Sequence, residues 1–155
     1  MRGRANGMST RVRAIAMDLW HASPGAEEQV RAAERLFDEP VDPEATRRFL
    51  ENEANHLIIA YVEDQPAGFV SGTELTHPDR AEPELFLNEL GVDPAFRGSG
   101  IGKALVAKLW EVAQFRGCRG MWVLTDASNP AAVKVYAGAG GVRLPEQLMF
   151  QWGRT

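Results

Sequence analysis

The sequence has 155 residues, of which 45% are hydrophobic and 25% are charged, so it is long enough to bury a core and too short for two full domains. Its formal net charge of −4 argues against a nucleic-acid-binding protein, which needs a basic surface, and is compatible with a cationic substrate. The single cysteine, Cys118, excludes an internal disulfide and fits a reducing cytoplasm.

Nothing in the sequence is typical of a membrane span or a metal site. The longest uninterrupted apolar run, residues 57–62, is far shorter than a membrane-spanning helix requires. The three histidines, His21, His56 and His77, lack the spacing of a metal site or a catalytic triad. We therefore expect a cytoplasmic protein without a metal, a membrane or a nucleic acid among its partners.

The N-terminal part of the chain predicts an extension, a strand and two helices. Residues 1–10 lack apolar periodicity, so we expect a disordered extension before a single domain of residues 11–155. Residues 11–17 alternate loosely, as in a strand. Ser23-Pro24 and Asp42-Pro43 are typical of helix starts, and apolar residues follow each of them at helical spacing.

Three strands are predicted next. Residues 57–62 are rich in β-formers and, after a turn, residues 67–75 resume an extended pattern, which predicts an antiparallel hairpin. The proline-containing residues 76–83 predict a loop. Residues 84–92 predict another strand, in which Gly91 marks a bulge or a close approach of other backbone.

A glycine-rich segment, Arg97-Gly98-Ser99-Gly100-Ile101-Gly102-Lys103, separates that strand from the most regular helical pattern in the sequence. Apolar residues recur on one face from Ile101 to Ala113, and Gly117 is placed to end the helix. Free N–H groups at a helix start bind anions such as phosphate, and glycine allows a close approach. The spacing does not match a Walker loop, and the dinucleotide-binding pattern is not convincingly matched.

The C-terminal part predicts two strands around a further helix. Residues 121–125 predict a short buried strand, and Asn129-Pro130 begins a helix that glycines end near residue 138. Leu148, Phe150 and Trp152 alternate as in a last strand, and Trp152 hints at a homodimer interface. The order of elements predicts a mixed α/β domain with helices interrupting one sheet.

Two motifs in this order resemble those of the GNAT acetyltransferase superfamily. Arg97-x-x-Gly100-x-Gly102 is similar to its cofactor-binding motif, and Asn129-x-x-Ala132-x-x-x-Tyr136-x-x-x-Gly140 resembles its later signature. The resemblance covers roughly residues 10–152 and implies an α/β fold with a mostly antiparallel sheet of about six or seven strands flanked by about four helices. Residues 36–40, the hairpin and residues 88–92 look most like the aminoglycoside 3-N-acetyltransferase branch. Gly141 departs from the pattern, which usually has an aromatic residue there, and this difference concerns local packing.

The resemblance implies acetyl-coenzyme A as the acyl donor. Its pyrophosphate would lie on the amides of the glycine-rich segment, and its pantetheine arm would pair with the strand edge that ends at Val92. Arg97 and Lys103 would add charge, although both also fit as solvated residues at a helix end. The implied cofactor-binding residues are Leu90, Gly91, Val92, Arg97, Gly98, Ser99, Gly100, Ile101, Gly102, Lys103, Asn129, Ala132 and Tyr136.

Direct transfer of an acetyl group to a primary amine requires a neutral amine, a stabilised oxyanion and a proton for the departing thiolate. Glu89 is the candidate base, and backbone N–H groups of residues 90–92 are the expected oxyanion donors. Tyr136 stands at the position of the superfamily's general acid, and a phenol is able to donate a proton at neutral pH. Each has a structural alternative, since Glu89 also fits as a solvent-facing carboxylate and Tyr136 as a core aromatic.

The sequence says least about the part of the site that would bind the amine acceptor. Asp126 and Glu84 fall near strand ends that should border it, where carboxylates attract a cationic small-molecule amine such as an aminoglycoside, but surface charge alone also explains them. An acyl-coenzyme A-binding sensor or scaffold without turnover fits the same motifs, because the glycine-rich segment explains binding alone.

Overall fold

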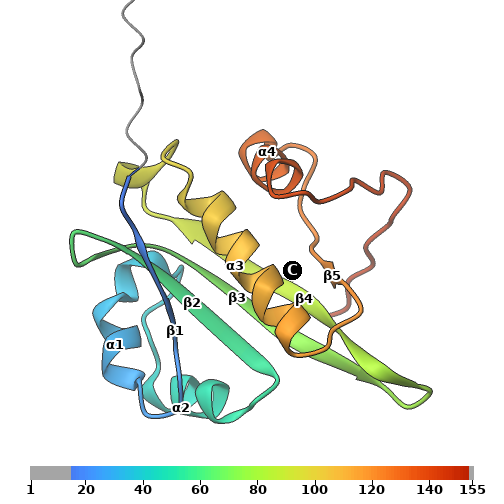
Figure 1. The fold of residues 1–155 in the computed structure, drawn as a ribbon, viewed down its shortest axis with the longest axis horizontal. Coiled ribbons are helices and arrows are strands. Elements are labelled where there is room, and N and C mark those ends of the chain that lie inside the picture. Colours follow the sequence, from blue (N-terminus) through green and yellow to red (C-terminus); the bar gives the residue numbers. More distant parts are fainter. Residues whose placement is uncertain (1–14, 154–155) are drawn as a thin grey trace, which may run out of the picture.

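A single five-stranded sheet forms the centre of the computed structural model, which describes residues 15–153 (Figure 1). The expectations for residues 1–10 and for the first residues of the N-terminal strand lie outside that range. The strand order is β1-β2-β3-β4-β5, in which the first four strands pair antiparallel and β5 pairs parallel to β4. The strands are β1 (Asp18–His21), β2 (Asn55–Val62), β3 (Gln65–His77), β4 (Arg80–Val92) and β5 (Met121–Trp122).

Helices cover both faces of the sheet (Figure 1). One face packs against α3 around a core that includes Ile58, Val70, Leu85 and Leu105, all of them fully buried. The other face packs against α1 and α2 around a second core that includes Ile59 and Phe69. The α-helices are α1 (Glu27–Ala32), α2 (Pro43–Glu51), α3 (Ile101–Phe115) and α4 (Pro130–Gly138), and the 3-10 helices are η1 (Glu34–Leu36) and η2 (Pro94–Phe96).

The predicted fold class is confirmed, because the sheet is mostly antiparallel and four α-helices flank it. The expected count of six or seven strands is wrong, since five are formed. Among the described residues, no strand forms over Leu148 to Trp152, and the strand predicted over residues 121–125 is limited to Met121–Trp122. A strand needs a hydrogen-bonded neighbour. Within the described chain, residues 148–152 pair with no strand, and residues 121–125 pair with β4 only at Met121 and Trp122.

The helix starts were predicted with mixed success. Asp42 and Asn129 are confirmed as N-caps, because the side chain of each accepts a hydrogen bond from the backbone of its helix. Ser23 is not a cap, since α1 begins later, at Glu27, without any side-chain cap. The predicted loop of residues 76–83 is instead a tight hairpin in which β3 and β4 continue to the turn, because paired strand backbone satisfies more hydrogen bonds than a loop.

Within residues 15–153, the structure contains no helix that is both long and apolar enough to cross a membrane.

Candidate active site

A β-bulge in β4 decides which side chains reach each face of the sheet. Glu89 pairs with Ser71 and Leu87 pairs with Gly72, so Asn88 is one extra residue in the ladder. Leu85 and Leu87 face α3, and after the bulge Leu90 and Val92 do so instead. Residues 89 and 91 therefore turn to the face covered by α1 and α2. The predicted bulge at Gly91 is thus wrong by three residues.

At Gly91 the alternative expectation of a close approach is confirmed. A Cβ atom there would lie 2.7 Å from Phe69 Cε1 and 3.3 Å from the carbonyl oxygen of Leu36. The first distance is too short for a Cβ atom, and the second is very tight. Only glycine therefore lets the residues after η1 lie over the sheet here.

The edge of β4 that faces β5 is open beyond the point where the two strands part. β5 pairs only with Leu85 and Phe86, whereas β4 continues to Val92. The backbone of residues 87–92 thus has a strand partner on one side only, namely β3. An edge of this kind accepts an extended amide-bearing chain as an added strand, which fits the pantetheine arm of coenzyme A.

The glycine-rich segment lies at the end of that edge and has the geometry expected of an anion site. Gly98 and Gly100 have φ of +76° and +85°, and nothing lies within 4 Å of a Cβ built on either residue. Gly100 is the N-cap of α3, and no side chain caps this helix start, so its first N–H groups are open. The Ser99 hydroxyl instead bonds to the carbonyl oxygen of Phe96 and holds the loop.

Three elements that carry predicted cofactor residues meet at Gly102. A Cβ atom on this buried residue would lie 3.3 Å from Val135 of α4 and 3.6 Å from Val92 of β4. Tyr136, next to Val135, is half-buried against the core beneath α3, and burial raises the pKa of its phenol. The Asn129 side chain accepts a 3.1 Å bond from the Ala132 N–H at the start of α4. The roles assigned to these residues stay predictions.

Replacing Gly100 by alanine is expected to weaken coenzyme A binding about tenfold or more, because the left-handed φ that presents the open amides is strained for any other residue. Gly117 is a matched control, since its φ is +78° and its surroundings are equally open, but it lies at the other end of α3. Calorimetric titration with coenzyme A measures the effect. Equal losses in Gly100→Ala and Gly117→Ala would contradict the anion site.

A cavity of about 650 Å³ lies on the opposite side of β4, between the sheet and the segment that links α1 to α2. Its apolar lining includes Phe37, Phe49 and Phe69, and the rings of Phe37 and Phe69 are 4.5 Å apart. The described residues that line it also include four carboxylates and no Lys, Arg or His. The acidic residues are Asp38, Glu39, Asp42 and Glu89.

Two charged residues hold the wall of this cavity in place. Arg35 donates a 2.6 Å hydrogen bond to the carbonyl oxygen of Pro66 and lies 3.4 Å from the Asp93 carboxylate. Glu34 accepts a 3.0 Å bond from the backbone N–H of Val41. The segment that carries Asp38 and Glu39 is therefore anchored at both ends.

The predicted acidic residues of the acceptor side lie elsewhere. Glu84 is 3.1 Å from the Nε2 atom of His77, near the β3–β4 hairpin. Asp126 accepts a 2.7 Å bond from the backbone N–H of Ser128, and this bond lowers the pKa of its exposed carboxyl. Neither residue lines the cavity, and their contact with an acceptor stays a prediction. Glu89, the candidate base, does line it.

Sequence reasoning missed the acidic cluster of Asp38, Glu39 and Asp42. Its signal was present, because residues 36–40 were among those that resemble the aminoglycoside branch, but only the folded chain brings them opposite Glu89. The reasoning also missed a buried polar network at the far end of α3. Among the described residues, no group of three or more His, Cys, Asp or Glu side chains is arranged to hold a metal ion.

That network joins His56, Glu74 and Arg116. His56 and Glu74 have only 5% and 7% of their side chains exposed, and the His56 Nε2 atom is 2.8 Å from Glu74 Oε1. Arg116 donates a 2.6 Å bond to the same carboxylate. Cys118 is buried beside it, at the joint between α3 and β5, and burial raises the pKa of its thiol, so it is not an activated nucleophile.

Two bacterial acetyltransferases are similar to this chain in sequence. The chain is 33% identical to N-alpha-acetyltransferase RimI of Mycobacterium tuberculosis over 107 residues, which are 69% of this chain and 65% of the relative. It is 31% identical to the acetyltransferase Atu2258 of Agrobacterium fabrum over 112 residues, 72% of this chain and 77% of the relative. A match to an uncharacterized protein of Mycobacterium leprae spans only 28% of that protein's length.

Solved structures with the same fold include aminoglycoside acetyltransferases. One from an uncultured soil metagenomic sample has a TM-score of 0.81 at 17% identity and covers 90% of this chain and 97% of its own. AAC(6')-Iy in complex with the bisubstrate analogue CoA-S-monomethyl-acetylneamine has a TM-score of 0.73 at 24% identity, with coverage of 90% and 99%. At these identities the likeness shows the fold alone.

A model of the acetyltransferase (GNAT) family matches residues 17–140, which is most of the chain and contains both motifs, the open edge of β4 and the cavity. The chain therefore belongs to the acetyltransferase (GNAT) family.

Proposed function

We propose that this protein transfers the acetyl group of acetyl-coenzyme A to a primary amine of a polycationic small molecule, with aminoglycosides as the acceptor class. The acidic cavity beside β4 is the observation that carries the proposal. The open edge of β4 and the free N–H groups at the start of α3 fit the donor, and the cavity on the opposite face of β4 fits the acceptor.

The charge and size of the cavity support a cationic acceptor. Four carboxylates without a neighbouring basic residue in the described lining favour a ligand that carries several ammonium groups. Its volume lies within the range of about 300–1,000 Å³ that is usual for small-molecule sites. The phenylalanine rings supply apolar surface against which sugar or aminocyclitol rings are able to stack.

Glu89 and Tyr136 have proton-transfer roles in this proposal. Bound acetyl-coenzyme A supplies the acetyl group as a thioester. The amine nitrogen bonds to the acetyl carbon as the carbon–sulfur bond breaks, Glu89 takes the proton that the amine loses, directly or through water, and Tyr136 protonates the departing sulfur. Glu89 lines the cavity, and the raised pKa of Tyr136 keeps its phenol protonated at neutral pH.

A thiol-release assay with acetyl-coenzyme A tests the function. The acceptor panel contains aminoglycosides, polyamines and peptides with free N-termini, because a relative is an N-alpha-acetyltransferase. Turnover with aminoglycosides supports the proposal, and turnover with peptides alone contradicts the acceptor class. Calorimetric binding of acetyl-coenzyme A without turnover on any amine would favour the sensor or scaffold function instead.

The position of acetylation is a finer part of the same proposal. The resemblance points to the 3-amino group of the aminoglycoside. Product NMR identifies the acetylated nitrogen, and acetylation at another amine would reject the 3-N assignment while leaving the enzyme class intact.

Removing two carboxylates from the cavity is expected to raise KM for a polycationic acceptor about tenfold or more and to leave KM for acetyl-coenzyme A unchanged. The variant Asp38→Asn with Glu39→Gln is suitable, because these exposed residues have no hydrogen bond to lose among those found in the described chain. The matched control, Asp79→Asn with Glu82→Gln, removes the same charge at the β3–β4 hairpin. Equal changes in both double variants would show that only net charge matters.

A further inference from the structure

One buried hydroxyl group lies on the floor of the cavity, on the middle strand of the sheet, β3. It belongs to Ser71, which is only 6% exposed and lines the cavity. Ser71 pairs with Leu57 of β2 on one side and with Glu89 of β4 on the other, and both of these residues also line the cavity. The three side chains therefore form one row across the sheet, on the face that α1 and α2 cover (Figure 1).

The Ser71 hydroxyl is free to bind a ligand. The other hydroxyl group of the lining belongs to Thr46, which donates a 2.8 Å bond to the carbonyl oxygen of Asp42. Among the hydrogen bonds found in the described chain, none engages the Ser71 hydroxyl. The described residues also contain no fully enclosed side-chain oxygen without a partner, so the Ser71 oxygen is open to the cavity. A ligand that fills the cavity and offers no partner here would leave a buried polar group unpaired, which is unfavourable.

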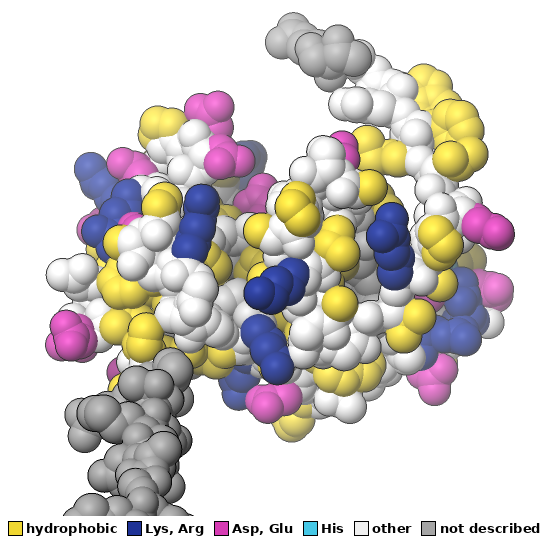
Figure 2. All heavy atoms as spheres, turned by 90° about the horizontal axis from the view of Figure 1, so that it is seen from above, with side chains coloured by type: hydrophobic (Ala, Val, Ile, Leu, Met, Phe, Trp, Pro, Cys, Tyr) yellow, Lys and Arg dark blue, Asp and Glu magenta, His cyan; other side chains and the backbone are white. Residues whose placement is uncertain are grey.

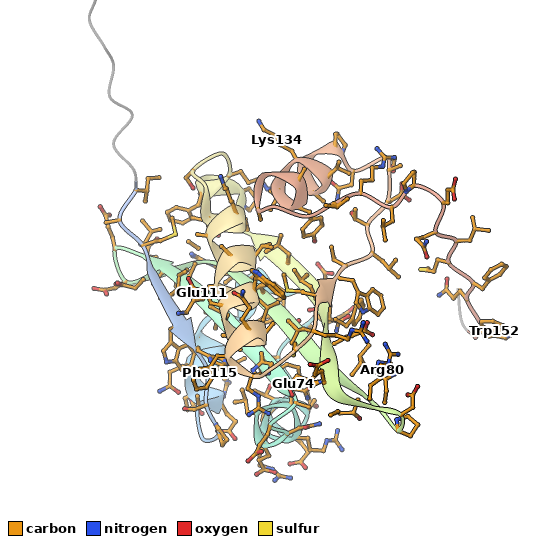
Figure 3. All side chains as sticks on the ribbon, turned by 45° about the vertical axis from the view of Figure 1, so that its right-hand side comes forward. Glu74, Arg80, Glu111, Phe115, Lys134 and Trp152 are labelled. Atoms are coloured by element: carbon orange, nitrogen blue, oxygen red, sulfur yellow. The ribbon has the colours of Figure 1, made fainter. Side chains whose placement is uncertain are left out.

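Charge divides the two sides of the site but does not orient the acceptor. Figure 2 looks down on the end of the molecule that carries α4 and the start of α3, where Lys and Arg side chains gather. Lys103 of α3 is exposed, and so is Lys134 of α4 (Figure 3). The described lining of the cavity has carboxylates and no basic residue. These charges direct a cation to the cavity, but they attract cations of any shape.

A neutral group of the ligand suits Ser71 better than a second ammonium group. The neighbouring side chains on the floor, Leu57 and Phe69, are apolar and only 5% and 4% exposed, so an ammonium group would lose its hydration against them. A serine hydroxyl both donates and accepts hydrogen bonds, and therefore pairs with a hydroxyl or an ether oxygen. Directly opposite residues of an antiparallel pair have Cβ atoms about 4.5–5.5 Å apart, so a group bound by Ser71 lies close to Glu89.

We propose that Ser71 makes the cavity selective for amines that carry a hydroxyl or ether oxygen on the carbon next to the one that bears the reacting nitrogen. The inference rests on the proposed function, in which Glu89 takes the proton that the amine loses. The Ser71 hydroxyl bonds to that oxygen while Glu89 faces the nitrogen, and the two contacts together orient the amine. The aminocyclitol ring of an aminoglycoside has this arrangement of nitrogen and oxygen. Simple polyamines, whose chains contain only carbon and nitrogen, lack it.

Steady-state kinetics with an aminoglycoside tests the contact through substitutions that keep the strand. Ser71→Ala is expected to raise KM for the aminoglycoside about fivefold to tenfold and to leave KM for acetyl-coenzyme A unchanged. Ser71→Cys fills the space but is a weak hydrogen-bond donor, so it should behave like Ser71→Ala. The control is Thr73→Val, which removes a hydroxyl from the same face of β3 outside the cavity lining and should leave both KM values unchanged. Thermal melts check that all three variants are folded.

A matched pair of small amines tests the selectivity itself. 2-Deoxystreptamine carries hydroxyl groups beside its two amines, and cis-1,3-diaminocyclohexane is the same diamine ring without them. Each is measured as an acceptor, or as a competitive inhibitor of aminoglycoside acetylation where its own turnover is slow. We expect the wild type to favour 2-deoxystreptamine at least about fivefold, and Ser71→Ala to lose most of that preference.

The outcomes separate the role of Ser71 from the function on which it rests. A preference for 2-deoxystreptamine that is lost in Ser71→Ala and kept in Thr73→Val supports the proposal. An unchanged KM for the aminoglycoside in Ser71→Ala, an equal effect of Thr73→Val, or recovery in Ser71→Cys would overturn it and leave the proposed function intact. A wild type without the preference, or a preference that survives Ser71→Ala, would do the same. No turnover of any aminoglycoside by the wild type would overturn both.

Discussion

Tyr136→Phe is expected to lower kcat by about 100-fold or more while changing the dissociation constant of acetyl-coenzyme A by less than about threefold. The substitution removes only the hydroxyl, and the half-buried ring keeps its packing against the core beneath α3. Burial raises the pKa of this phenol, so the wild-type group holds a proton to donate across the neutral range. Steady-state kinetics and calorimetry on the same preparation separate the two effects.

Glu89→Gln is the matching change on the acceptor side. It should lower kcat/KM most for a strongly basic amine and least for an amine that is already neutral at the assay pH, because only the former needs a base. Unchanged kcat in Tyr136→Phe would remove Tyr136 as the acid, and an equal effect of Glu89→Gln on both amines would remove Glu89 as the base.

Glu74→Gln is expected to destabilise the fold by about 2–4 kcal/mol, because it removes the carboxylate that a buried histidine and an arginine share. The control is Glu111→Gln on α3, whose carboxylate lies 3.1 Å from Lys108 and is 66% exposed, so its loss should cost less than about 0.5 kcal/mol (Figure 3). Urea unfolding measures both. Similar costs for the two variants would show that the network contributes no more than a surface pair.

The same network, which His21 joins because its Nε2 atom lies 3.2 Å from His56 Nδ1, predicts how stability depends on pH. Burial alone would raise the pKa of Glu74, but hydrogen bonds from Arg116 and His56 lower it below the ordinary value of 4.5. Burial, followed by the charges of His56 and Lys108, lowers the pKa of His21 below 6.5. In each case the unfolded chain binds the proton first, so stability should fall as the pH drops below 6.5 and fall further below 4.5.

Local patterns in the sequence were enough to predict most of the elements and the family. The hairpin of β2 and β3, the long α3 and the Asn129 cap all depend on residues close together in the chain, and each is confirmed. The last strand was wrong because alternation shows only that a segment suits a strand. A neighbour must still be present, and residues 148–152 have none within the described chain.

The sequence predicts the donor side of the site better than it predicts the acceptor side. The glycine-rich segment is contiguous, so its spacing alone indicates an anion site at a helix start. The cavity joins residues 37–49 to Glu89 across the fold, and its lining depends on the position of the bulge at Asn88. No residue type marks a bulge uniquely. The glycine at position 91 was therefore predicted as the bulge, although the extra residue is Asn88. The buried link from His56 to Glu74 likewise spans separate strands.

The bulge at Asn88 makes the pairing register of β4 matter more to this site than the chemistry of that residue. Before it, odd-numbered side chains face α3, and after it they face the acidic cavity. If the full-length strand paired without this bulge, its remaining alternation would reverse, directing Glu89 into the core and Leu90 toward the acceptor. Deleting Asn88 would instead leave Glu89 directly after Leu87, opposite Ser71 as it already is, so that both side chains would keep their faces. Functional relatives should therefore either keep the bulge, with many side chains tolerated at position 88, or lack that residue altogether.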